Sequence, residues 1–195
     1  MVRLNCDNIV AMHKIAVVSD THVPDKIRSL NPNLIPALLD YSPELIIHAG
    51  DFVTYRIKKK FEEIAPLVGV KGNRDLLMVN LPHKYFLTVD EIKIGITHGH
   101  GTFLSYLFDR LSIVLSGPKS FEFFERKVKK ILAGVDVMVY GHSHCPLIRK
   151  EKDYLLFNPG SPSVVNQFYP QLRPSIGVLE IDGSQIYAKI IFLDK

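Results

Sequence analysis

Five short apolar runs in this chain each end directly in polar residues that include aspartate, asparagine or histidine, and this pattern limits the fold more than any other feature. The runs cover residues 14–19, 44–48, 66–71, 92–97 and 136–140. Continuous apolar runs of this length, rich in Val and Ile, are typical of buried β-strands, and parallel strands in particular are covered on both faces. In open α/β sheets the carboxyl ends of the strands form the ligand crevice. We therefore expect the five polar clusters to converge on one site.

The remaining segments complete an α/β pattern. Helical spacing predicts helices over residues 32–41 and 53–64, between the first three runs. A helical region is expected from residue 102 to about 133, with a break at Gly117–Pro118. Further strands are expected over residues 84–89, 147–150, 154–157, 175–181 and 185–193. The last two are joined by Asp182-Gly183-Ser184, a hairpin signal, so the tail of the chain should be mostly antiparallel. The pattern favours two packed sheets with outer helices.

Length and composition fit one domain. The chain has 195 residues, 47% hydrophobic and 23% charged, which is ordinary for a globular protein. We expect one domain over residues 1–195, with residues 1–12 as an N-terminal extension, because Met12 precedes the first strand. The formal net charge of +4 favours anionic substrates but does not by itself indicate nucleic acid. The basic run at residues 56–60 is expected to be the solvated face of a helix.

The cysteines and the apolar stretches of the sequence indicate in which cellular compartment the protein is expected. Cys6 and Cys145 form no disulfide framework, so a cytoplasmic location is expected. Cys145 is expected to be a small buried filler rather than a redox group. Residues 1–13 lack the apolar region of a signal peptide. The longest apolar stretch, residues 103–115, is too short to span a bilayer and contains two charges, so no membrane association is expected.

The polar residues after the strands are of the types that bind transition metals. They are Asp20, His22, Asp51, Asn73, His98, His142 and His144. Carboxylate, imidazole and amide oxygen suit Mn, Fe, Zn, Ni or Co better than a soft copper site. Seven such groups are too many for one tetrahedral ion and fit two ions roughly 3.5–4 Å apart that share one carboxylate. The sequence therefore predicts a two-metal site. His48 and His83, in contrast, are expected to be a core residue and a loop residue.

The order of the motifs resembles a known family. The motifs are DxH at residues 20–22, GD at 50–51, GN at 72–73, HGH at 98–100, GHSH at 141–144 and NPGS at 158–161. In this order, over residues 14–165, they resemble the calcineurin-like metallophosphoesterase superfamily, and within it the small single-domain archaeal and bacterial phosphodiesterases. The resemblance implies a four-layer α-β-β-α sandwich of two mixed sheets flanked by helices, with the metal site at the C-terminal ends of strands.

The resemblance also implies a role for each ligand. One ion would be bound by Asp20, His22 and His144, the other by Asn73, His98 and His142, and Asp51 would bridge them. Mn²⁺ is expected first, with Ni²⁺, Fe²⁺, Zn²⁺ and Co²⁺ left open. A metal-bound hydroxide would attack phosphorus in line. The ions and Asn73 would stabilise the charge that develops on the phosphoryl oxygens.

One position departs from the family pattern. Many members have a histidine after the asparagine of the GN motif, and that residue helps to protonate the leaving group. This chain has Arg74, which stays charged and is a poor general acid but can clamp a phosphate oxygen. Asp75 is expected to orient Arg74 or to pair with it. His100 is the nearest alternative acid, so Asn73, Arg74 and His100 are the candidate catalytic residues.

Several functions are compatible with this pattern. The first hypothesis is a metal-dependent phosphodiesterase acting on a small or activated phosphodiester. A phosphomonoesterase or nucleotide phosphatase is the alternative enzyme, and nucleic acid is a less expected substrate because no capping domain is visible. A eukaryotic retromer subunit shares the fold as a scaffold but has lost parts of the metal set. A structural metal protein without turnover is the third class.

A homodimer is expected from exposed aromatic residues and from what the family resemblance implies. Phe121, Phe123 and Phe124 are expected in the core or at the subunit interface, and a lid over the site is the less favoured alternative.

Overall fold

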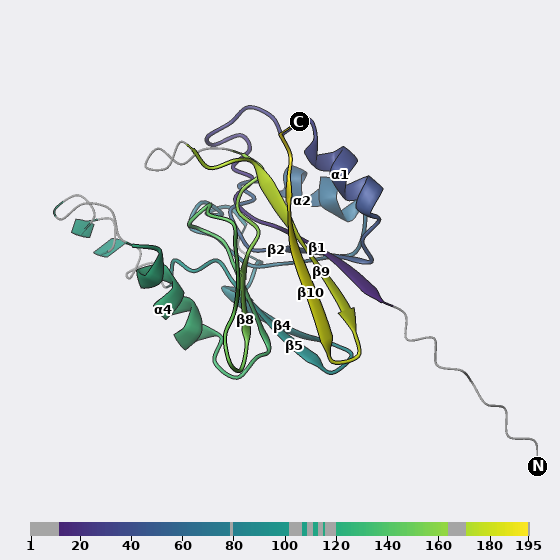
Figure 1. Cartoon of the computed structure of the whole chain (residues 1–195). Helices are drawn as coiled ribbons and strands as arrows, with labels where there is room; N and C mark the ends of the chain where they lie inside the picture. Colours follow the sequence, from purple (N-terminus) through teal and green to yellow (C-terminus); the bar gives the residue numbers. More distant parts are fainter. Residues whose placement is uncertain are drawn as a thin grey trace, which may run out of the picture.

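The computed structural model describes residues 12–78, 80–101, 107–108, 111–112, 115, 120–163 and 171–194. One five-stranded sheet contains β1 (His13–Val18), β2 (Leu45–His48), β3 (Leu67–Gly69), β9 (Ser175–Asp182) and β10 (Gln185–Phe192). The other contains β4 (Lys84–Val89), β5 (Ile92–Thr97), β6 (Val137–Tyr140), β7 (Leu147–Lys150) and β8 (Leu155–Asn158). Helices α1 (Leu34–Tyr41), α2 (Tyr55–Glu62) and α4 (Phe121–Ile131) lie outside them (Figure 1).

Both sheets are mixed. The strand order is β10-β9-β1-β2-β3 in the first sheet and β4-β5-β6-β8-β7 in the second. In each sheet three neighbouring strands are parallel: β1, β2 and β3 in one, and β5, β6 and β8 in the other. Antiparallel strands β9 and β10 extend the first sheet, while β4 and β7 form the edges of the second. The parallel strands are the ones that lead into the polar clusters.

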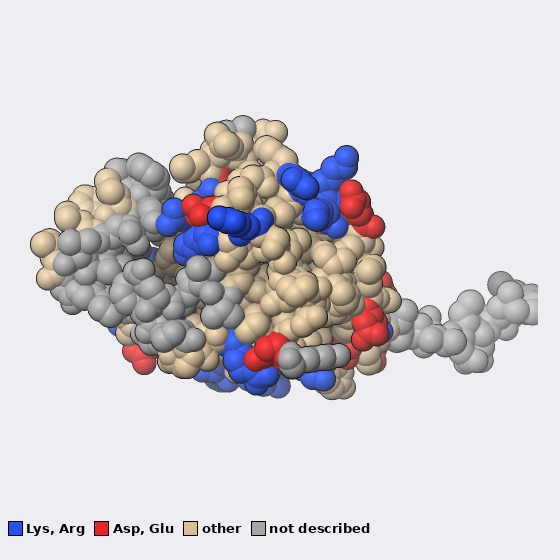
Figure 2. Space-filling view, turned by 90° about the horizontal axis from the view of Figure 1, so that it is seen from above, with Lys and Arg blue, Asp and Glu red and all other residues tan. Residues whose placement is uncertain are grey.

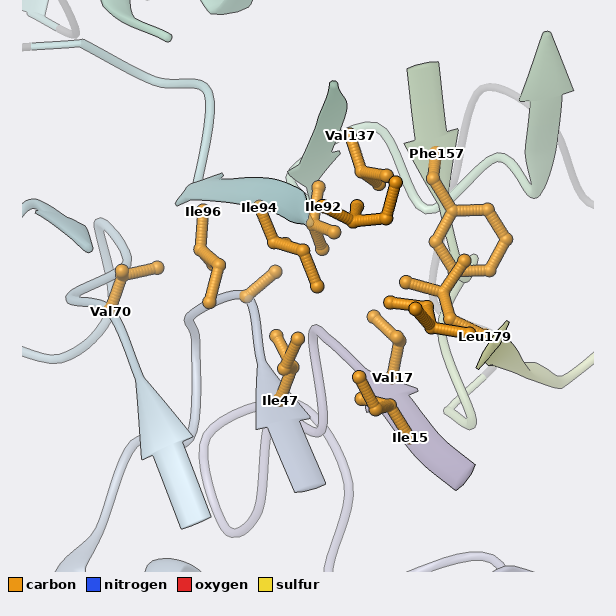
Figure 3. Packing of buried hydrophobic residues seen from close by; sticks show 13 residues of the cluster. Ile15, Val17, Ile47, Val70, Ile92, Ile94, Ile96, Val137, Phe157 and Leu179 are labelled. Carbon is orange, nitrogen blue, oxygen red and sulfur yellow. The ribbon is translucent and has the colours of Figure 1, made fainter. Parts of the chain in front are cut away.

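The side chains of β1 show how the sequence builds the layers. Successive side chains of a strand point to opposite faces. Ile15 and Val17 pack between the sheets, against Ile94 and Val137 among others (Figure 3). Ala16 and Val18, on the other face of the same strand, pack beneath the outer helices. The four consecutive apolar residues Ile15, Ala16, Val17 and Val18 therefore place this strand in the middle of a layered fold.

The outer helices cover the two remaining faces. Leu34 and Leu38 of α1 join Ile57 and Phe61 of α2 in the core outside the first sheet. Val128 and Leu132, at the end of α4, pack with Met138, Tyr140 and Leu156 outside the second sheet. The predicted four-layer α-β-β-α sandwich is therefore confirmed.

Two segments from the sequence analysis lie partly outside the described residues. The predicted helical region over residues 102–133 contains α4, but its break at Gly117–Pro118 lies outside the described residues, as does most of the N-terminal extension. Within the described part of the chain, no helix is long and apolar enough to cross a bilayer.

Candidate metal centre

The turns after five strands bring all seven predicted ligands to one place. Asp20 and His22 follow β1, Asp51 follows β2, Asn73 follows β3, His98 follows β5, and His142 and His144 follow β6. All except Asn73 and His142 are buried, and those two are partly buried. The strands that carry them belong to both sheets. The site therefore lies where the C-terminal ends of the two sets of parallel strands meet.

The ligand atoms divide into two groups with Asp51 between them. In the first group, His144 Nε2 lies 3.1 Å from His22 Nε2 and 3.3 Å from Asp20 Oδ1. In the second, Asn73 Oδ1 lies 3.1 Å from His98 Nε2 and 2.9 Å from His142 Nδ1.

The position of Asp51 connects the two groups. Its Oδ2 lies 3.7 Å from His22 Nε2 in the first group and 3.5 Å from His98 Nε2 in the second. A carboxylate placed in this way can be shared by two ions. Metal binding by these residues and the division of the ligands between two ions stay predictions.

The chemistry of the buried donor atoms fits cations. Asp20 Oδ1 has no hydrogen-bond partner among the described residues, although it is fully buried. His98 Nδ1 donates to the carbonyl oxygen of Ala49 at 2.7 Å, so Nε2, which lies 3.1 Å from Asn73 Oδ1, is the ring nitrogen that can bind a metal once it has lost its proton. A buried carboxylate oxygen that accepts no hydrogen bond is costly unless a cation lies beside it. The residues present therefore fit divalent metal ions.

The protonation states agree with this picture. Burial lowers the pKa of His22 to about 4 and holds the pKa of His142 well below its usual value, so both rings are neutral and can ligate a metal. Burial would raise the pKa of Asp20, but the neighbouring imidazoles of His144 and His98 outweigh it and hold that pKa well below its usual value. Asp20 is therefore a carboxylate.

His98 is the exception, and it leads to a prediction. Burial disfavours its charged form, but the carboxylates of Asp51 and Asp20 outweigh burial and raise its pKa to about 9 in the metal-free protein. Below that pH His98 holds a proton that a metal must displace. We expect Mn²⁺ binding near neutral pH to release about one proton, and affinity to rise as pH increases towards 9.

Calorimetric titrations in buffers of different ionisation enthalpy measure this proton. The variant His98→Gln, which has no titrating ring, is the control and should release no such proton on binding the remaining ion. Binding to the wild-type protein without proton release would contradict the assignment of His98 as a ligand.

Five of the seven predicted ligands have strained backbone conformations. Their φ angles are positive: Asp20 56°, His22 54°, Asp51 61°, His142 68° and His144 57°. Non-glycine residues in this region cost of order 1–3 kcal/mol each, and such residues cluster at functional sites. The turns therefore direct these side chains towards a common centre, and the strained backbone of the turns lowers the stability of the fold.

Hydrogen bonds hold the ligand turns in place. Asp20 Oδ2 accepts from Ser19 Oγ at 2.6 Å and from the amide of His142 at 3.0 Å, which leaves Oδ1 directed at the imidazoles. Ser161 Oγ donates to the carbonyl oxygen of Asp20, and Asn158 Nδ2 donates to that of Gly141. The NPGS motif thus supports the turns after β1 and β6. Its location directly after a strand is the sequence signal that could have predicted this role.

The expectation for Asp75 is wrong. Its carboxylate is fully buried and accepts backbone hydrogen bonds from Gly72 at 2.8 Å, Asp51 at 2.9 Å and Val53 at 2.7 Å. The Arg74 side chain instead pairs with Asp25, with Nη1 and Oδ2 3.5 Å apart. Asp75 therefore shapes the loop that carries Asp51 and does not orient Arg74.

Replacing Asp75 tests this structural role. In Asp75→Asn the amide nitrogen cannot accept, so at least one backbone N–H loses its partner, and we expect a loss of roughly 2–3 kcal/mol in the free energy of unfolding. Metal affinity should fall as well, because Asp51 shifts. Urea denaturation and metal titration measure the two effects. Wild-type stability in this variant would show that Asp75 does not hold the loop.

Comparisons with known proteins identify the family. The sequence profile of the calcineurin-like phosphoesterase superfamily domain matches residues 13–184. The chain belongs to this superfamily. It is similar to a probable metallophosphoesterase of Methanothermobacter thermautotrophicus, 33% identical over 179 residues that cover 91% of each chain. A phosphodiesterase of Methanocaldococcus jannaschii is 28% identical over 192 residues, which cover 91% of this chain and 98% of the relative.

Solved structures extend the comparison of the fold. Vacuolar protein sorting 29 from Cryptosporidium parvum has a TM-score of 0.73 and 18% sequence identity, covering 94% of this chain and 92% of that chain. At this identity the similarity concerns the fold alone. The superfamily match makes the chain a metallophosphoesterase-type hydrolase domain, as the motifs predicted.

The remaining candidates in this phosphoesterase domain have distinct surroundings. The His100 ring lies 5.3 Å from His98 and 6.2 Å from His142, measured between centroids. Burial and the neighbouring His98 lower the pKa of His100 to about 3, so at neutral pH it is an imidazole rather than an imidazolium acid. The Phe124 ring, at the start of α4, lies 5.0 Å from His142 and forms one side of the site.

His48 and Cys145 have structural surroundings, as expected. His48 is fully buried, stacks on Phe52 at 3.5 Å between centroids, and accepts from the amide of Gly50 at 3.2 Å. Burial raises the pKa of the Cys145 thiol, which disfavours the reactive thiolate.

Proposed function

We propose that this protein is a metal-dependent phosphodiesterase that hydrolyses a small phosphodiester with two ions bound by the seven residues. The observation that carries the proposal is the position of Asp51 Oδ2 between His22 Nε2 and His98 Nε2, at 3.7 and 3.5 Å. The 28% identical archaeal relative is a phosphodiesterase, which supports phosphodiester hydrolysis as the reaction class. Mn²⁺ is the proposed metal, because the donor set combines carboxylates, an amide and imidazoles.

The protein's own residues have separate tasks in this proposal. When bound, the ions would lower the pKa of a water molecule and polarise the phosphoryl group. Asp51 would be shared by both ions, and Asp20 supplies the second negative charge of the site. Asn73 would supply its carboxamide oxygen to one ion, and its amide could donate to a phosphoryl oxygen. Arg74 contributes a fixed positive charge beside Asn73.

In the proposed reaction, this protein offers no efficient acid among the candidate residues to protonate the leaving group. Arg74 keeps its proton, and the neutral His100 can donate a hydrogen bond but is a poor acid at neutral pH. Bound cations would lower the pKa of His100 further. We therefore propose that the protein acts best on esters with good leaving groups, and that diesters with alkoxide leaving groups react slowly.

The face of the molecule shown in Figure 2 does not favour nucleic acid as the substrate. On the face shown in Figure 2, Lys and Arg side chains form separate groups with Asp or Glu beside several of them, not one continuous basic surface. Of the basic run in α2, Lys58 is ion-paired with Glu62 of the same helix. A small anionic ester is the better match, because duplex or single-stranded nucleic acid is usually bound along an extended basic surface.

A phosphoester panel tests the proposal. Purified protein is assayed with bis(4-nitrophenyl) phosphate, thymidine 5′-(4-nitrophenyl) phosphate and 4-nitrophenyl phosphate, each with Mn²⁺, Ni²⁺, Mg²⁺ or Zn²⁺. We expect the two diesters to be hydrolysed fastest with Mn²⁺. Faster hydrolysis of the monoester would favour a phosphatase. No hydrolysis with any metal, despite two bound ions, would favour a structural metal protein or a scaffold of the kind suggested by the vacuolar protein sorting 29 fold.

A further inference from the structure

Two cationic side chains and one carboxylate lie at the rim of the metal centre, outside the seven ligands. Arg74 follows Asn73 directly, and its amide donates to Asp51 Oδ1 at 2.7 Å, so its backbone is fixed beside the carboxylate that separates the two groups. The amide of Lys26 donates to the carbonyl oxygen of His22 at 3.0 Å, which fixes Lys26 one turn away from a ligand of the first group. The backbones of the two cationic residues are therefore fixed next to predicted ligands of the centre.

The contact between Arg74 and Asp25 is a loose one. Its 3.5 Å separation is longer than the 2.7–2.9 Å of a charge-assisted hydrogen bond, and the two side chains are 40% and 30% exposed. Arg173 shows the contrast, because it donates through Nε and Nη2 to Asp194 at 2.6 and 2.8 Å. An exposed ion pair of this kind contributes only about 0–1 kcal/mol, so an incoming anion can displace it.

The Lys26 side chain is exposed, and its ammonium interacts with the same charges. Partial desolvation lowers the pKa of Lys26, Asp20 opposes this effect, and the Arg74 guanidinium lowers the pKa further. Asp51 and Asp25 act on it in the same direction as Asp20. Lys26, Arg74 and Asp25 together leave one net positive charge at the mouth of the site. A phosphodiester that reacts at the ions has one negative charge of its own, so the rim can bind a further anionic group.

We propose that Arg74 and Lys26 form an anion-binding rim that selects phosphodiesters carrying a second phosphate group, with Asp25 competing for Arg74. This inference rests on the proposed function and adds a substrate class to it. The guanidinium suits the second phosphate because its planar fork matches two phosphate oxygens, while the ammonium acts as a point charge. In the absence of such a substrate, Asp25 neutralises part of the rim.

A matched pair of substrates tests the rim. Thymidine 5′-(4-nitrophenyl) phosphate and its 3′-phosphorylated form share one reacting diester and differ by one phosphate. The measured quantity is the ratio of their kcat/KM values in the Mn²⁺-loaded protein. We expect the ratio to fall about tenfold in Arg74→Gln and in Lys26→Met, because each removes a hydrogen bond to a charged group. The ratio should rise about threefold in Asp25→Asn, which removes the competing carboxylate.

Controls separate the rim from the fold and from turnover. Each ratio is internal to one variant, so a partly unfolded preparation does not change it. Lys189→Ala, which removes an exposed cation on β10, should keep the wild-type ratio. A parallel binding measurement compares thymidine 3′,5′-bisphosphate with thymidine 5′-phosphate in the same variants, and it does not require hydrolysis.

The possible outcomes distinguish this inference from the proposed function. The rim proposal would be overturned if all three rim variants kept the wild-type kcat/KM ratio and the wild-type ratio of binding affinities. Hydrolysis of either diester in that case would leave the proposed function intact. Changed binding ratios in a protein that hydrolyses neither diester would support the rim and overturn the proposed function.

Discussion

Replacing Asp51 with asparagine is expected to reduce phosphodiester hydrolysis by about a thousandfold or more. The carboxylate lies between two groups of ligands, with Oδ2 within 3.7 Å of an imidazole nitrogen of each. An amide has no negative charge to share between two ions, so the variant should bind one ion per chain or fewer. The fold should survive, because the amide oxygen of Asn can still accept from the Arg74 amide that Asp51 Oδ1 binds.

A second Asp→Asn variant controls for the loss of charge. Asp136 lies just before β6, at the opposite end of that strand from the metal centre, and its Oδ2 accepts from the amide of Lys93. Asp136→Asn should keep both ions and at least about half of the activity. Turnover of thymidine 5′-(4-nitrophenyl) phosphate and metal content after gel filtration are the two measurements. An active Asp51→Asn variant with two ions would remove the basis for the bridging assignment.

A methyl group at Gly72 is expected to disrupt the site through its geometry rather than through its charge. A Cβ atom there would lie 2.1 Å from Asp51 Oδ1 and 2.3 Å from the Asp51 amide nitrogen. Neither atom can move freely, because Arg74 donates to Oδ1 and Asp75 accepts from the amide. Gly72→Ala should therefore displace Asp51, abolish binding of at least one ion, and lower the free energy of unfolding by about 3 kcal/mol.

Gly134 provides the matched substitution away from the site. No atom lies within 4 Å of a Cβ placed there, but φ is +86°. Gly134→Ala should cost only about 1 kcal/mol from backbone strain and leave metal binding unchanged. Urea denaturation and metal titration compare the two variants. If Gly72→Ala bound two ions with wild-type affinity, the close packing of the loop against Asp51 could not be what positions the ligand.

The strands and their ends could be predicted from the sequence for a simple physical reason. Residues 15–18 of the run over 14–19 are all apolar, so this part of the chain fits best between two apolar layers, as β1 does with Val17 inward and Val18 outward. The next polar residues must then leave the core at the carboxyl end of the strand. The predicted ligands therefore meet at the carboxyl ends of these strands.

The sequence pattern overestimated one strand. The run over residues 66–71 predicted six residues of strand, whereas β3 covers Leu67–Gly69. Pro66 has no amide hydrogen to donate. The Val70 amide still donates to the carbonyl oxygen of His48 in β2, but the Lys71 amide donates to the carbonyl oxygen of Pro82 instead. Apolar character persists in this segment because Val70 packs in the core without belonging to the strand.

Partners of charged side chains could not be predicted from the sequence. Asp75 is adjacent to Arg74, but a tight turn directs its carboxylate at the backbone amides of Gly72, Asp51 and Val53. Asp25, the residue that does pair with Arg74, is 49 positions away along the chain, counted from residue 25 to residue 74. Such contacts depend on how two loops from different strands meet. The protonation state of His100 depends likewise on its burial beside His98.

The position of two ions in crystals of the Mn²⁺-loaded protein tests the central claim most directly. Anomalous scattering should show two peaks roughly 3.5–4 Å apart with Asp51 between them. One should lie among Asp20, His22 and His144, and the other among Asn73, His98 and His142. A single peak, or a second peak away from Asp51, would contradict a shared two-metal centre.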